Sequence, residues 1–335
     1  MGALRIEPFA GRPLLNIASY GRPGPGRRDR LTPEQVAHIA RTVGQTPEVM
    51  LKVLTRNSSD LSSVRRHLGY IGRDGELELE TDDGERIGGK GIGRQLAEDW
   101  NLDLEMHRSN AELTAANGRR PPKLVHKLIF SMPAGTSPKA VESAARNFLR
   151  EEFGLKHRYA FVLHTDEPHP HVHAVIKAVS EQGQRLNIRK ATLRRWRAEF
   201  ARHLRAHGVA ANATERAVRG QIIKAKLDPI YRAMADPRRT STHERDKAIG
   251  IRGALAKGMP LNELGKARLQ ATRHSVANGW LGIADLLNQQ GETSLAHAAV
   301  RFMEGMRSPK TETELMVLQL RDHVLQRSRM QAPVR

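Results

Sequence analysis

Hydrophobic and polar positions alternate with helical and strand-like periods, most regularly between about residues 47 and 220. Apolar residues three and four positions apart, preceded by capping residues or proline, predict helices, whereas short apolar or alternating runs predict strands. The predicted helices cover residues 33–43, 92–106, 138–153 and 191–207, with a further helix after the capping residues 57–60 that ends near Tyr70. The predicted strands cover residues 49–54, 76–80, 125–132, 158–163 and 171–179.

Helices and strands that follow one another through short connections predict an α+β fold. The pair Asp83-Gly84 after an alternating run predicts a β-hairpin. We therefore expect three regions: an N-terminal extension of residues 1–46, an α+β core of residues 47–220, and a helical C-terminal region of residues 221–335. The extension is expected to be partly disordered, because its glycine- and proline-rich segment at 21–26 cannot hold regular structure.

The composition adds an expected partner and removes several kinds of chemistry. Lysine and arginine number 55 against 36 aspartates and glutamates, so the formal net charge is +19. Such a charge favours an anionic partner, most often nucleic acid. Cysteine is absent, which excludes disulfides, thiolate–metal ligation and cysteine nucleophiles. A metal ion would therefore have to be held by histidines and carboxylates.

Two targeting features are missing from the sequence. It has no run of about 18 uncharged apolar residues, the length that would indicate a membrane span. Its first ten residues contain Arg5 and Glu7 and no sustained apolar stretch, so they do not resemble a secretory signal. We expect a cytoplasmic bacterial protein without a membrane span.

The ten residues from His164 to His173 carry the most informative pattern, because four of them are histidines. His171 and His173 lie two apart on a predicted strand, so their side chains leave the same face. His164 ends the preceding strand, and a proline-rich turn returns the chain antiparallel beside it. Three imidazoles can therefore converge on a divalent metal, whereas His169, in the turn, is expected at the surface. The alternatives are a histidine-rich surface turn without metal and an adventitious or structural metal site.

A site of three neutral histidines leaves most of the charge of a divalent cation uncompensated. Such a site suits an anionic ligand such as a phosphodiester, which the metal would polarise. Without cysteine, a covalent phosphoryl intermediate would form on serine, threonine, histidine or tyrosine. Of the four tyrosines, Tyr159 is expected to pack within a strand, and Tyr20 and Tyr231 lie in segments without readable structure. Tyr70 stands at a predicted helix end beside Arg73, but on these residues alone an ordinary amphipathic tyrosine is the favoured interpretation.

Three segments resemble the sequence motifs of the MobP-type conjugative relaxases. Residues 64–79 resemble motif I, residues 126–135 resemble motif II, and residues 164–173 resemble motif III. Residues 212–220 are similar to a further segment that follows the catalytic core of that family. The order and spacing agree, so the resemblance covers about residues 47–220. Within the family, the similarity is greatest to the endonucleases that nick Ti-plasmid T-DNA borders.

The resemblance implies the HUH-endonuclease fold, an antiparallel sheet flanked by helices with metal-binding histidines on central strands. It implies that Tyr70 is the nucleophile and that His164, His171 and His173 are the metal ligands. The implied cofactor is a divalent ion, Mg²⁺ or Mn²⁺.

The resemblance also implies roles for residues around this centre. Asp166 matches an acidic residue that orients a ligand histidine or assists tyrosine activation. Ser131 matches a serine associated with gripping DNA beside the nick. Pro168 departs from the pattern, since relatives often carry a carboxylate there, and Glu167 is the candidate substitute as an extra ligand or acid–base group.

The implied function is site- and strand-specific nicking and religation at an origin of transfer, which initiates conjugative DNA transfer. Tyr70 would attack one phosphodiester of single-stranded DNA and leave a free 3′-hydroxyl and a covalent 5′-phosphotyrosyl end. The implied partners are this DNA, relaxosome accessory proteins and a type IV secretion coupling protein. The protein would accompany the DNA into the recipient cell.

A basic stretch between residues 185 and 205 is expected to follow the DNA backbone electrostatically. Arg194 and Arg195 in this stretch, together with Arg73, are the candidate DNA-binding arginines. A solvated helix face is the alternative interpretation of the stretch.

Three other functions remain open from the sequence. A rolling-circle replication initiator would use the same chemistry on a different origin. A nonenzymatic DNA-binding accessory protein would carry a degenerate site, against which the intact set of Tyr70 and three histidines argues. An unrelated metal-dependent hydrolase of small substrates would not need the large positive charge. The role of residues 221–335 is not indicated by any motif.

Overall fold

The computed structural model describes residues 30–54, 58–115, 121–221, 242–261 and 265–330. The chain divides into two compact units, one of residues 45–213 and the other combining residues 1–44 with residues 214–335. Tyr20 and Tyr231 lie outside the described residues.

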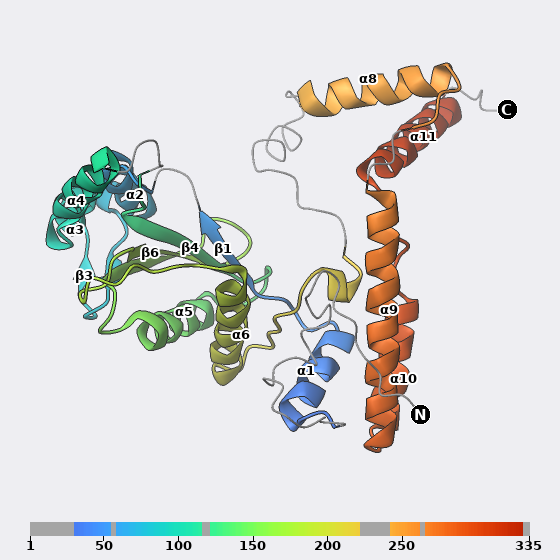
Figure 1. The fold of residues 1–335 in the computed structure, drawn as a ribbon, viewed down its shortest axis with the longest axis horizontal. Helices are drawn as coiled ribbons and strands as arrows, with labels where there is room; N and C mark the ends of the chain where they lie inside the picture. Colours follow the sequence, from blue (N-terminus) through green and yellow to red (C-terminus); the bar gives the residue numbers. More distant parts are fainter. Residues whose placement is uncertain (1–29, 55–57, 116–120, 222–241, 262–264, 331–335) are drawn as a thin grey trace. The chain divides into compact units, whose positions relative to one another are not determined.

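Residues 45–213 fold around a six-stranded antiparallel sheet with the strand order β1-β4-β6-β5-β2-β3 (Figure 1). The strands are β1 Met50–Leu54, β2 Leu79–Thr81, β3 Arg86–Ile87, β4 Val125–Ser131, β5 Tyr159–His164 and β6 His171–Lys177. The predicted α+β fold with an antiparallel sheet is confirmed.

Helices cover both faces of this sheet. The helices are α2 Leu61–Ile71, α3 Ile92–Asp99, α4 Leu102–Ala115, α5 Pro138–Phe153 and α6 Lys190–Ala206. Figure 1 shows α2, α3 and α4 on one side of the sheet and α5 and α6 on the other. Each side has its own core: Phe130, Phe148 and Trp196 pack under α5 and α6, and Leu68 and Trp100 pack under α2 and α3. Two buried apolar clusters hold the sheet between the helical layers.

The predicted single helix over residues 92–106 is wrong, because the chain forms two helices there. Trp100 ends α3 and is fully buried, and Asn101 takes the left-handed conformation with φ of 50° before α4 begins. Asparagine tolerates this conformation better than most residues, so the chain can turn and bury the indole. The predicted strand over residues 76–80 also begins later, at Leu79, because the amide of Leu77 donates to the carbonyl of Gly72 in the preceding turn.

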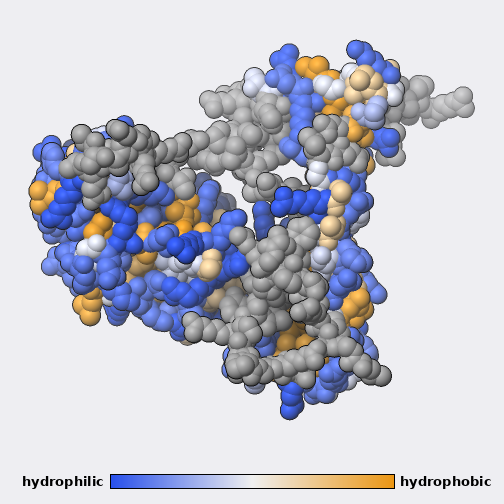
Figure 2. Space-filling view, viewed as in Figure 1, coloured by the Kyte–Doolittle hydropathy of each residue, from blue (hydrophilic) through white to orange (hydrophobic). Residues whose placement is uncertain are grey.

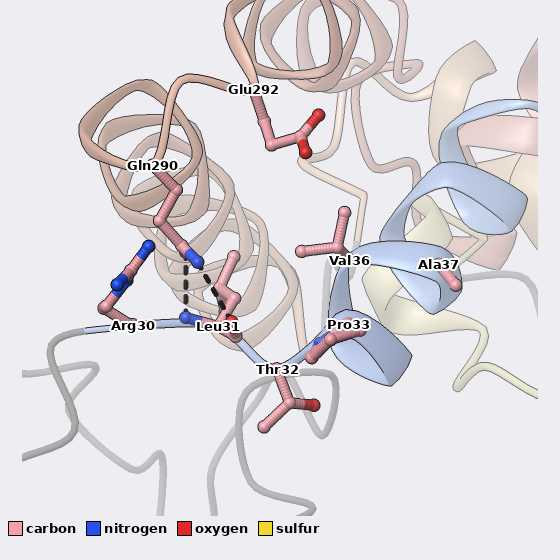
Figure 3. Close-up of a pocket in the computed structure, with 8 residues that line it drawn as sticks. All are labelled: Arg30, Leu31, Thr32, Pro33, Val36, Ala37, Gln290 and Glu292. Atoms are coloured by element: carbon pink, nitrogen blue, oxygen red, sulfur yellow. Dashed lines mark hydrogen bonds between the residues drawn. The ribbon is translucent and has the colours of Figure 1, made fainter.

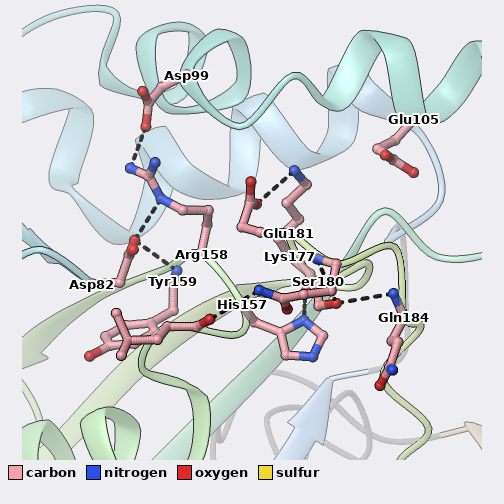
Figure 4. A network of polar contacts seen from close by, with 12 residues as sticks. Asp82, Asp99, Glu105, His157, Arg158, Tyr159, Lys177, Ser180, Glu181 and Gln184 are labelled. Atoms are coloured by element: carbon pink, nitrogen blue, oxygen red, sulfur yellow. Dashed lines mark hydrogen bonds and ion pairs between the residues drawn. The ribbon is translucent and has the colours of Figure 1, made fainter.

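An ion-pair network fixes the β2–β3 hairpin and α3 to the start of β5 (Figure 4). Arg158 Nε donates to Asp82 Oδ1 at 2.9 Å, and its Nη2 donates to Asp99 Oδ2 at 2.8 Å. The amide of Tyr159 also donates to Asp82 Oδ1, at 3.2 Å. Close packing adds to this anchoring: a Cβ on Gly93 of α3 would lie 2.1 Å from the carbonyl oxygen of Arg65 on α2. The α2–α3 layer is therefore held closely against the sheet.

A buried histidine outside the candidate site makes the stability of this unit depend on pH. His126 on β4 is buried, and its Nε2 donates to the carbonyl of Leu186 at 3.2 Å. Burial, helped by Lys123, lowers the pKa of His126 to about 4. The unfolded chain, with a histidine pKa of about 6.5, binds this proton at a higher pH than the folded protein does. Stability from the neutral ring is therefore complete above about pH 6.5 and is lost as the pH falls toward 4.

We expect His126→Gln to reduce this acid sensitivity. The free energy of unfolding of the variant should fall less steeply between pH 6.5 and 4.5, by up to about 1.4 kcal/mol per pH unit. Urea unfolding at several pH values measures both slopes, and equal slopes for the two proteins would contradict the prediction.

The second unit is helical and is built from both ends of the chain. Its helices are α1 Pro33–Val43, α8 Thr242–Ala256, α9 Lys266–Gln289, α10 Thr293–Glu304 and α11 Glu312–Met330. Helix α1 begins with the predicted capping box of Thr32 and Gln35. The side chain of Gln290 accepts from the amide of Leu31 at 2.8 Å and donates to its carbonyl at 3.0 Å (Figure 3). Residues of α1, α9 and α10 share one core around Trp280, so the segment before the sheet unit folds with the segment after it.

Helices α8 and α11 contact each other and expose part of their apolar surface. Lys247 on α8 pairs with Glu312 on α11 at 2.5 Å. Ile249 and Leu255 on α8 are exposed, and Figure 2 shows orange side chains among the hydrophilic ones of this helix. Among the described residues, no helix is both long and apolar enough to cross a bilayer.

Candidate active site

Three histidines converge on one face of the central strands. His164 at the end of β5 lies opposite His171 at the start of β6, and His173 follows on the same face of β6. One nitrogen from each of the three rings lies within 4.8 Å of those of the other two. The ring centroids are 4.7 to 5.3 Å apart. The turn at residues 165–170 therefore does bring the three side chains together.

Hydrogen bonds to carbonyl groups determine which ring nitrogens remain available. His164 Nε2 lies 2.7 Å from the carbonyl oxygen of Ile71. Because a carbonyl oxygen can only accept a hydrogen bond, Nε2 carries the proton, and Nδ1 is available to bind a metal ion. By the same argument, His171 Nδ1 donates to the carbonyl of His169 at 3.2 Å and leaves Nε2 available. His173 Nδ1 is buried and has no hydrogen-bond partner among the described residues. An unpartnered nitrogen beside two available ones fits a bound cation.

The electrostatics keep two of the three rings neutral at neutral pH. Burial lowers the pKa of His164, and it lowers the pKa of His173 to about 3, with the neighbouring His164 and His171 adding to the effect. Neutral imidazole is the form that binds metal ions. His164 and His173 are therefore in the form that metal binding requires.

The acidic residues of the turn lie outside this cluster. Asp166, Glu167 and His169 are exposed, and among the described residues the group able to hold a metal consists of the three histidines alone. Asp166 instead accepts a hydrogen bond from Arg73. Burial opposes its ionisation, but backbone hydrogen bonding and the charge of Arg73 outweigh this effect and lower the pKa of Asp166. The expected exposure of His169 is confirmed.

Helix α2 brings Tyr70 to the histidines. The side chain of Asp60 caps the helix, and the buried residues Val64, Leu68 and Ile71 fix its apolar face against the sheet. Tyr70 near the end of this helix is 57% exposed. Its ring stacks on His67 at a centroid distance of 6.4 Å, and His67 in turn lies 6.5 Å from the ring of His173.

The loop after α2 holds Arg73 over Tyr70. The guanidinium carbon of Arg73 lies 5.7 Å from the centroid of the tyrosine ring. Arg73 and Asp74 adopt left-handed conformations with φ of 51° and 53°, which is uncommon for consecutive residues other than glycine. Such backbone strain is found most often at functional sites. Arg73 thus joins Tyr70 to Asp166 at the edge of the histidine cluster.

Two residues near the cluster were missed from the sequence. His67 lies between Tyr70 and His173, and burial, with Lys127 adding to the effect, lowers its pKa to about 4. Lys127 on β4 is itself only 4% exposed, and burial lowers its pKa. Two signals in the sequence could have identified them: His67 lies three residues before Tyr70, and His126 and Lys127 are adjacent polar residues near the start of the mostly apolar strand at 125–131.

The remaining candidate residues lie at different distances from the cluster. Ser131 is buried on β4 directly opposite His171, so it shares the face of the histidines. Arg194 and Arg195 lie on α6, which covers the other face of the sheet. Arg195 donates to Glu152 on α5 at 2.6 Å. The structure therefore brings Ser131 to the histidines but leaves Arg194 and Arg195 on the opposite layer, because the apolar face of α6 packs with α5.

A sheet with three convergent histidines and a tyrosine on a neighbouring helix defines a candidate phosphodiester-processing site. Residues 80–209 match the family model described as "Relaxase: MobA/VirD2-like, nuclease domain". The T-DNA border endonuclease VirD2 of Rhizobium radiobacter is 29% identical over 183 residues, which cover 48% of this chain and 40% of that relative. VirD2 of Agrobacterium fabrum strain C58 is 28% identical over 183 residues, which cover 48% of this chain and 38% of that relative.

A solved structure is also similar, although weakly. The Mn-bound MobM relaxase domain in complex with plasmid pMV158 oriT DNA has a TM-score of 0.36 and 13% sequence identity, over 56% of this chain and 100% of that one. By the family model and the two curated relatives, residues 80–209 resemble the nuclease domain of MobA/VirD2-like relaxases, and the chain is similar to VirD2. The chain covers less than half the length of these two curated relatives. Tyr70 lies before the residues that the family model matches.

We expect Arg73→Ala to slow DNA cleavage more than it weakens DNA binding. Its guanidinium group is held beside Tyr70, where it can stabilise charge that develops on the reacting phosphate, so the single-turnover rate should fall by about 100-fold. Arg66→Ala removes an equally positive, exposed side chain of α2 and should leave the rate nearly unchanged. Quenched-flow cleavage of a labelled oligonucleotide gives the rates, and fluorescence anisotropy gives the affinities. Equal rates for the two variants would contradict this role.

Proposed function

We propose that this protein nicks and rejoins single-stranded DNA at an origin of transfer through a covalent phosphotyrosyl intermediate. The observation that carries the proposal is the position of Tyr70, linked through His67 to three converging histidines in a unit whose residues 80–209 resemble a relaxase nuclease domain. We assign the nuclease activity to residues 47–220. The VirD2 relatives are T-DNA border endonucleases, which agrees with DNA as the substrate.

In the proposed reaction, Tyr70 Oη attacks the scissile phosphorus and loses its proton. The bond from phosphorus to the 3′ oxygen breaks, that oxygen gains a proton, and the 5′ phosphate remains on the tyrosine. The ester retains the bond energy, so the 3′-hydroxyl can attack it and close the strand again. Arg73 stabilises the phosphate charge, and Asp166 holds Arg73 in place.

The histidine cluster suits a Mg²⁺ or Mn²⁺ ion. His164, His171 and His173 would hold it, whereas the exposed Glu167, the additional ligand considered from the sequence, lies outside this group. A bound cation supplies Lewis-acid stabilisation of negative charge on the phosphate oxygens. Ser131 is proposed to contact the DNA beside the nick, because it lies opposite His171 on the same face.

The positive charge of the chain and its similarity to relaxases indicate how it would attract DNA and where it would act. Arg194 and Arg195 would contribute to nonspecific attraction of DNA from the opposite layer, and this attraction should weaken as salt is added. We propose relaxosome accessory proteins and a type IV secretion coupling protein as partners, action in the bacterial cytoplasm, and transfer to the recipient cell with the DNA.

A denaturing gel tests the proposal directly. The protein is incubated with end-labelled, single-stranded origin oligonucleotides and Mn²⁺, and the expected result is a labelled band at the mass of protein plus DNA. Chelation of the metal should remove the band, and duplex DNA should yield little of it, since pairing holds the phosphate away from the site. No covalent band over a broad set of origin oligonucleotides would refute the proposal.

A further inference from the structure

The side chain of Tyr70 is exposed and has few contacts that could hold it in one place. It lies in the last turn of α2, and among the described residues its hydroxyl group has no hydrogen-bond partner. An exposed side chain exchanges between staggered rotamers, and each rotamer of a tyrosine puts the hydroxyl in a different place. A nucleophile has to keep its oxygen near the scissile phosphorus, since a misplacement of about 1 Å can slow a reaction about 100-fold. The proposed reaction therefore needs a support for this ring.

Two residues contact the ring of Tyr70. His67 lies one helical turn earlier on α2, and its imidazole stacks on the phenol with 22° between the ring planes. Residues three apart are neighbours on a helix surface, so α2 itself brings these two rings together. Arg73 lies over the ring from the loop after α2 and also donates to Asp166. Because Arg73 is assigned to the charge of the phosphate, His67 is the contact that remains when the guanidinium group engages the DNA.

His67 is held more firmly than the tyrosine that it contacts. Its side chain is half-buried, and its ring meets the ring of His173 on β6 at 70°. The backbone between His67 and Tyr70 is also tightly packed, because a Cβ on Gly93 of α3 would lie 3.1 Å from the amide nitrogen of Gly69. The imidazole is therefore a fixed surface between the sheet and the exposed phenol, and a site supported in this way keeps its geometry.

The contact between the two rings does not provide a path for the proton of the hydroxyl group. No hydrogen bond joins His67 to Tyr70 in the part of the chain that the structure describes. Imidazole nitrogens donate and accept in the plane of their ring, whereas this contact is a stack of nearly parallel rings. Among the described residues, the group able to hold a metal does not include His67. The shape of the ring is what His67 offers to Tyr70.

We propose that His67 is a positioning residue that holds the phenol of Tyr70 beside the metal-binding histidines before the DNA is cleaved. This inference rests on the proposed nicking function and deepens it. The stacking contact restricts the rotamers of the tyrosine and leaves its hydroxyl free to reach the phosphorus. His67 acts through Tyr70, without contacting the DNA, binding the cation or accepting the proton.

Single-turnover adduct formation by the full chain at saturating DNA tests this role with three substitutions. His67→Ala removes the ring and should lower the rate about tenfold, the entropic cost of fixing one free side chain. The affinities for DNA and for Mn²⁺ should stay near those of the wild type. His67→Phe keeps an aromatic ring without nitrogens and should restore most of the rate, with the pH profile of the wild type. His67→Gln keeps a polar side chain without a ring and should remain slow.

Fluorine NMR of protein labelled with 3-fluorotyrosine reports on the Tyr70 ring without DNA and without activity. The resonance that disappears in Tyr70→Phe identifies this ring. In His67→Ala it should become narrower and move toward the position of a solvent-exposed tyrosine, whereas His67→Phe should leave it nearly unchanged. The matched control is His107→Ala, which removes an exposed histidine from α4 in the same helical layer and should change neither the rate nor the resonance. If His67→Ala does not fold, the comparison of His67→Phe with His67→Gln decides the case.

The outcomes separate this role from the alternatives. If His67→Phe is as slow as His67→Ala, the ring nitrogens take part in the chemistry and the positioning role is wrong. A loss of Mn²⁺ affinity in His67→Ala as large as that in His171→Ala would show that His67 acts on the metal site instead. An unchanged Tyr70 resonance in His67→Ala would also overturn the inference while the nicking function stands. If the wild type forms no adduct, the nicking function fails and the positioning role fails with it, even where the resonance still reports the contact between the rings.

Discussion

Tyr70→Phe should abolish the covalent protein–DNA adduct, and cleavage should fall by at least about 10³-fold, because the variant lacks the attacking oxygen. The ring itself should remain in place, since its contacts with His67 and Arg73 involve the aromatic face rather than the hydroxyl. Folding and DNA affinity should therefore be nearly unchanged. A denaturing gel measures the adduct, and anisotropy with an uncleavable oligonucleotide measures the affinity.

Tyr159→Phe is the matched control for this substitution. Tyr159 is 2% exposed within the core on the other face of the sheet, and burial raises its pKa to about 12, so its hydroxyl cannot act as the nucleophile. Tyr20→Phe and Tyr231→Phe complete the series of four tyrosines. An adduct that persists in Tyr70→Phe and disappears in one of the others would show that the wrong tyrosine has been assigned.

His171→Ala should remove both metal binding and cleavage. His171 is the most accessible of the three histidines, so its truncation leaves the smallest cavity and the least damage to the fold. Metal affinity should fall by about 100-fold or more. Removal of a residue that only hydrogen-bonds to a metal ligand already lowers metal affinity by about 10- to 100-fold. Isothermal titration with Mn²⁺ measures the affinity, and the gel assay measures cleavage.

Thermal unfolding provides a readout of metal binding that does not depend on activity. An ion present at 100 times its dissociation constant stabilises the folded wild type by about 2.7 kcal/mol, and His171→Ala should lose most of this gain. The matched control is His169→Ala, which removes an exposed ring that lies 5.8 Å from the ring of His171 but outside the group able to hold a metal. Equal stabilisation of both variants by Mn²⁺ would show that the cation binds elsewhere.

Local sequence signals were sufficient to predict most of the individual helices and strands. The capping box at Thr32 and Gln35, the cap at Asp60 and the apolar spacing of Val64, Leu68 and Ile71 define α1 and α2 through contacts within a few residues. The convergence of His164, His171 and His173 was also predictable, because a short turn and the two-residue period of a strand determine it.

Other features depend on contacts between distant segments. The break at Trp100 and Asn101 arises because the indole is buried in a core formed with other elements. Arg195 was expected to face DNA, but it pairs with Glu152, which lies 43 residues away in the sequence. His67 gained its candidate role only when α2 packed against the sheet and placed it beside His173.

The sequence by itself determined the chemistry that this protein can offer: histidines without cysteine, a positively charged chain, and relaxase-like motifs in order. It also determined the antiparallel turn that joins two of the histidine-bearing strands. The tertiary structure alone decided which face of the sheet each side chain occupies, and that α1 packs with α9 and α10 of the C-terminal segment. The physical reason is the sequence distance over which each interaction acts. Helix caps and hydrophobic periodicity involve residues a few positions apart, whereas strand order and burial depend on packing between segments far apart in the chain.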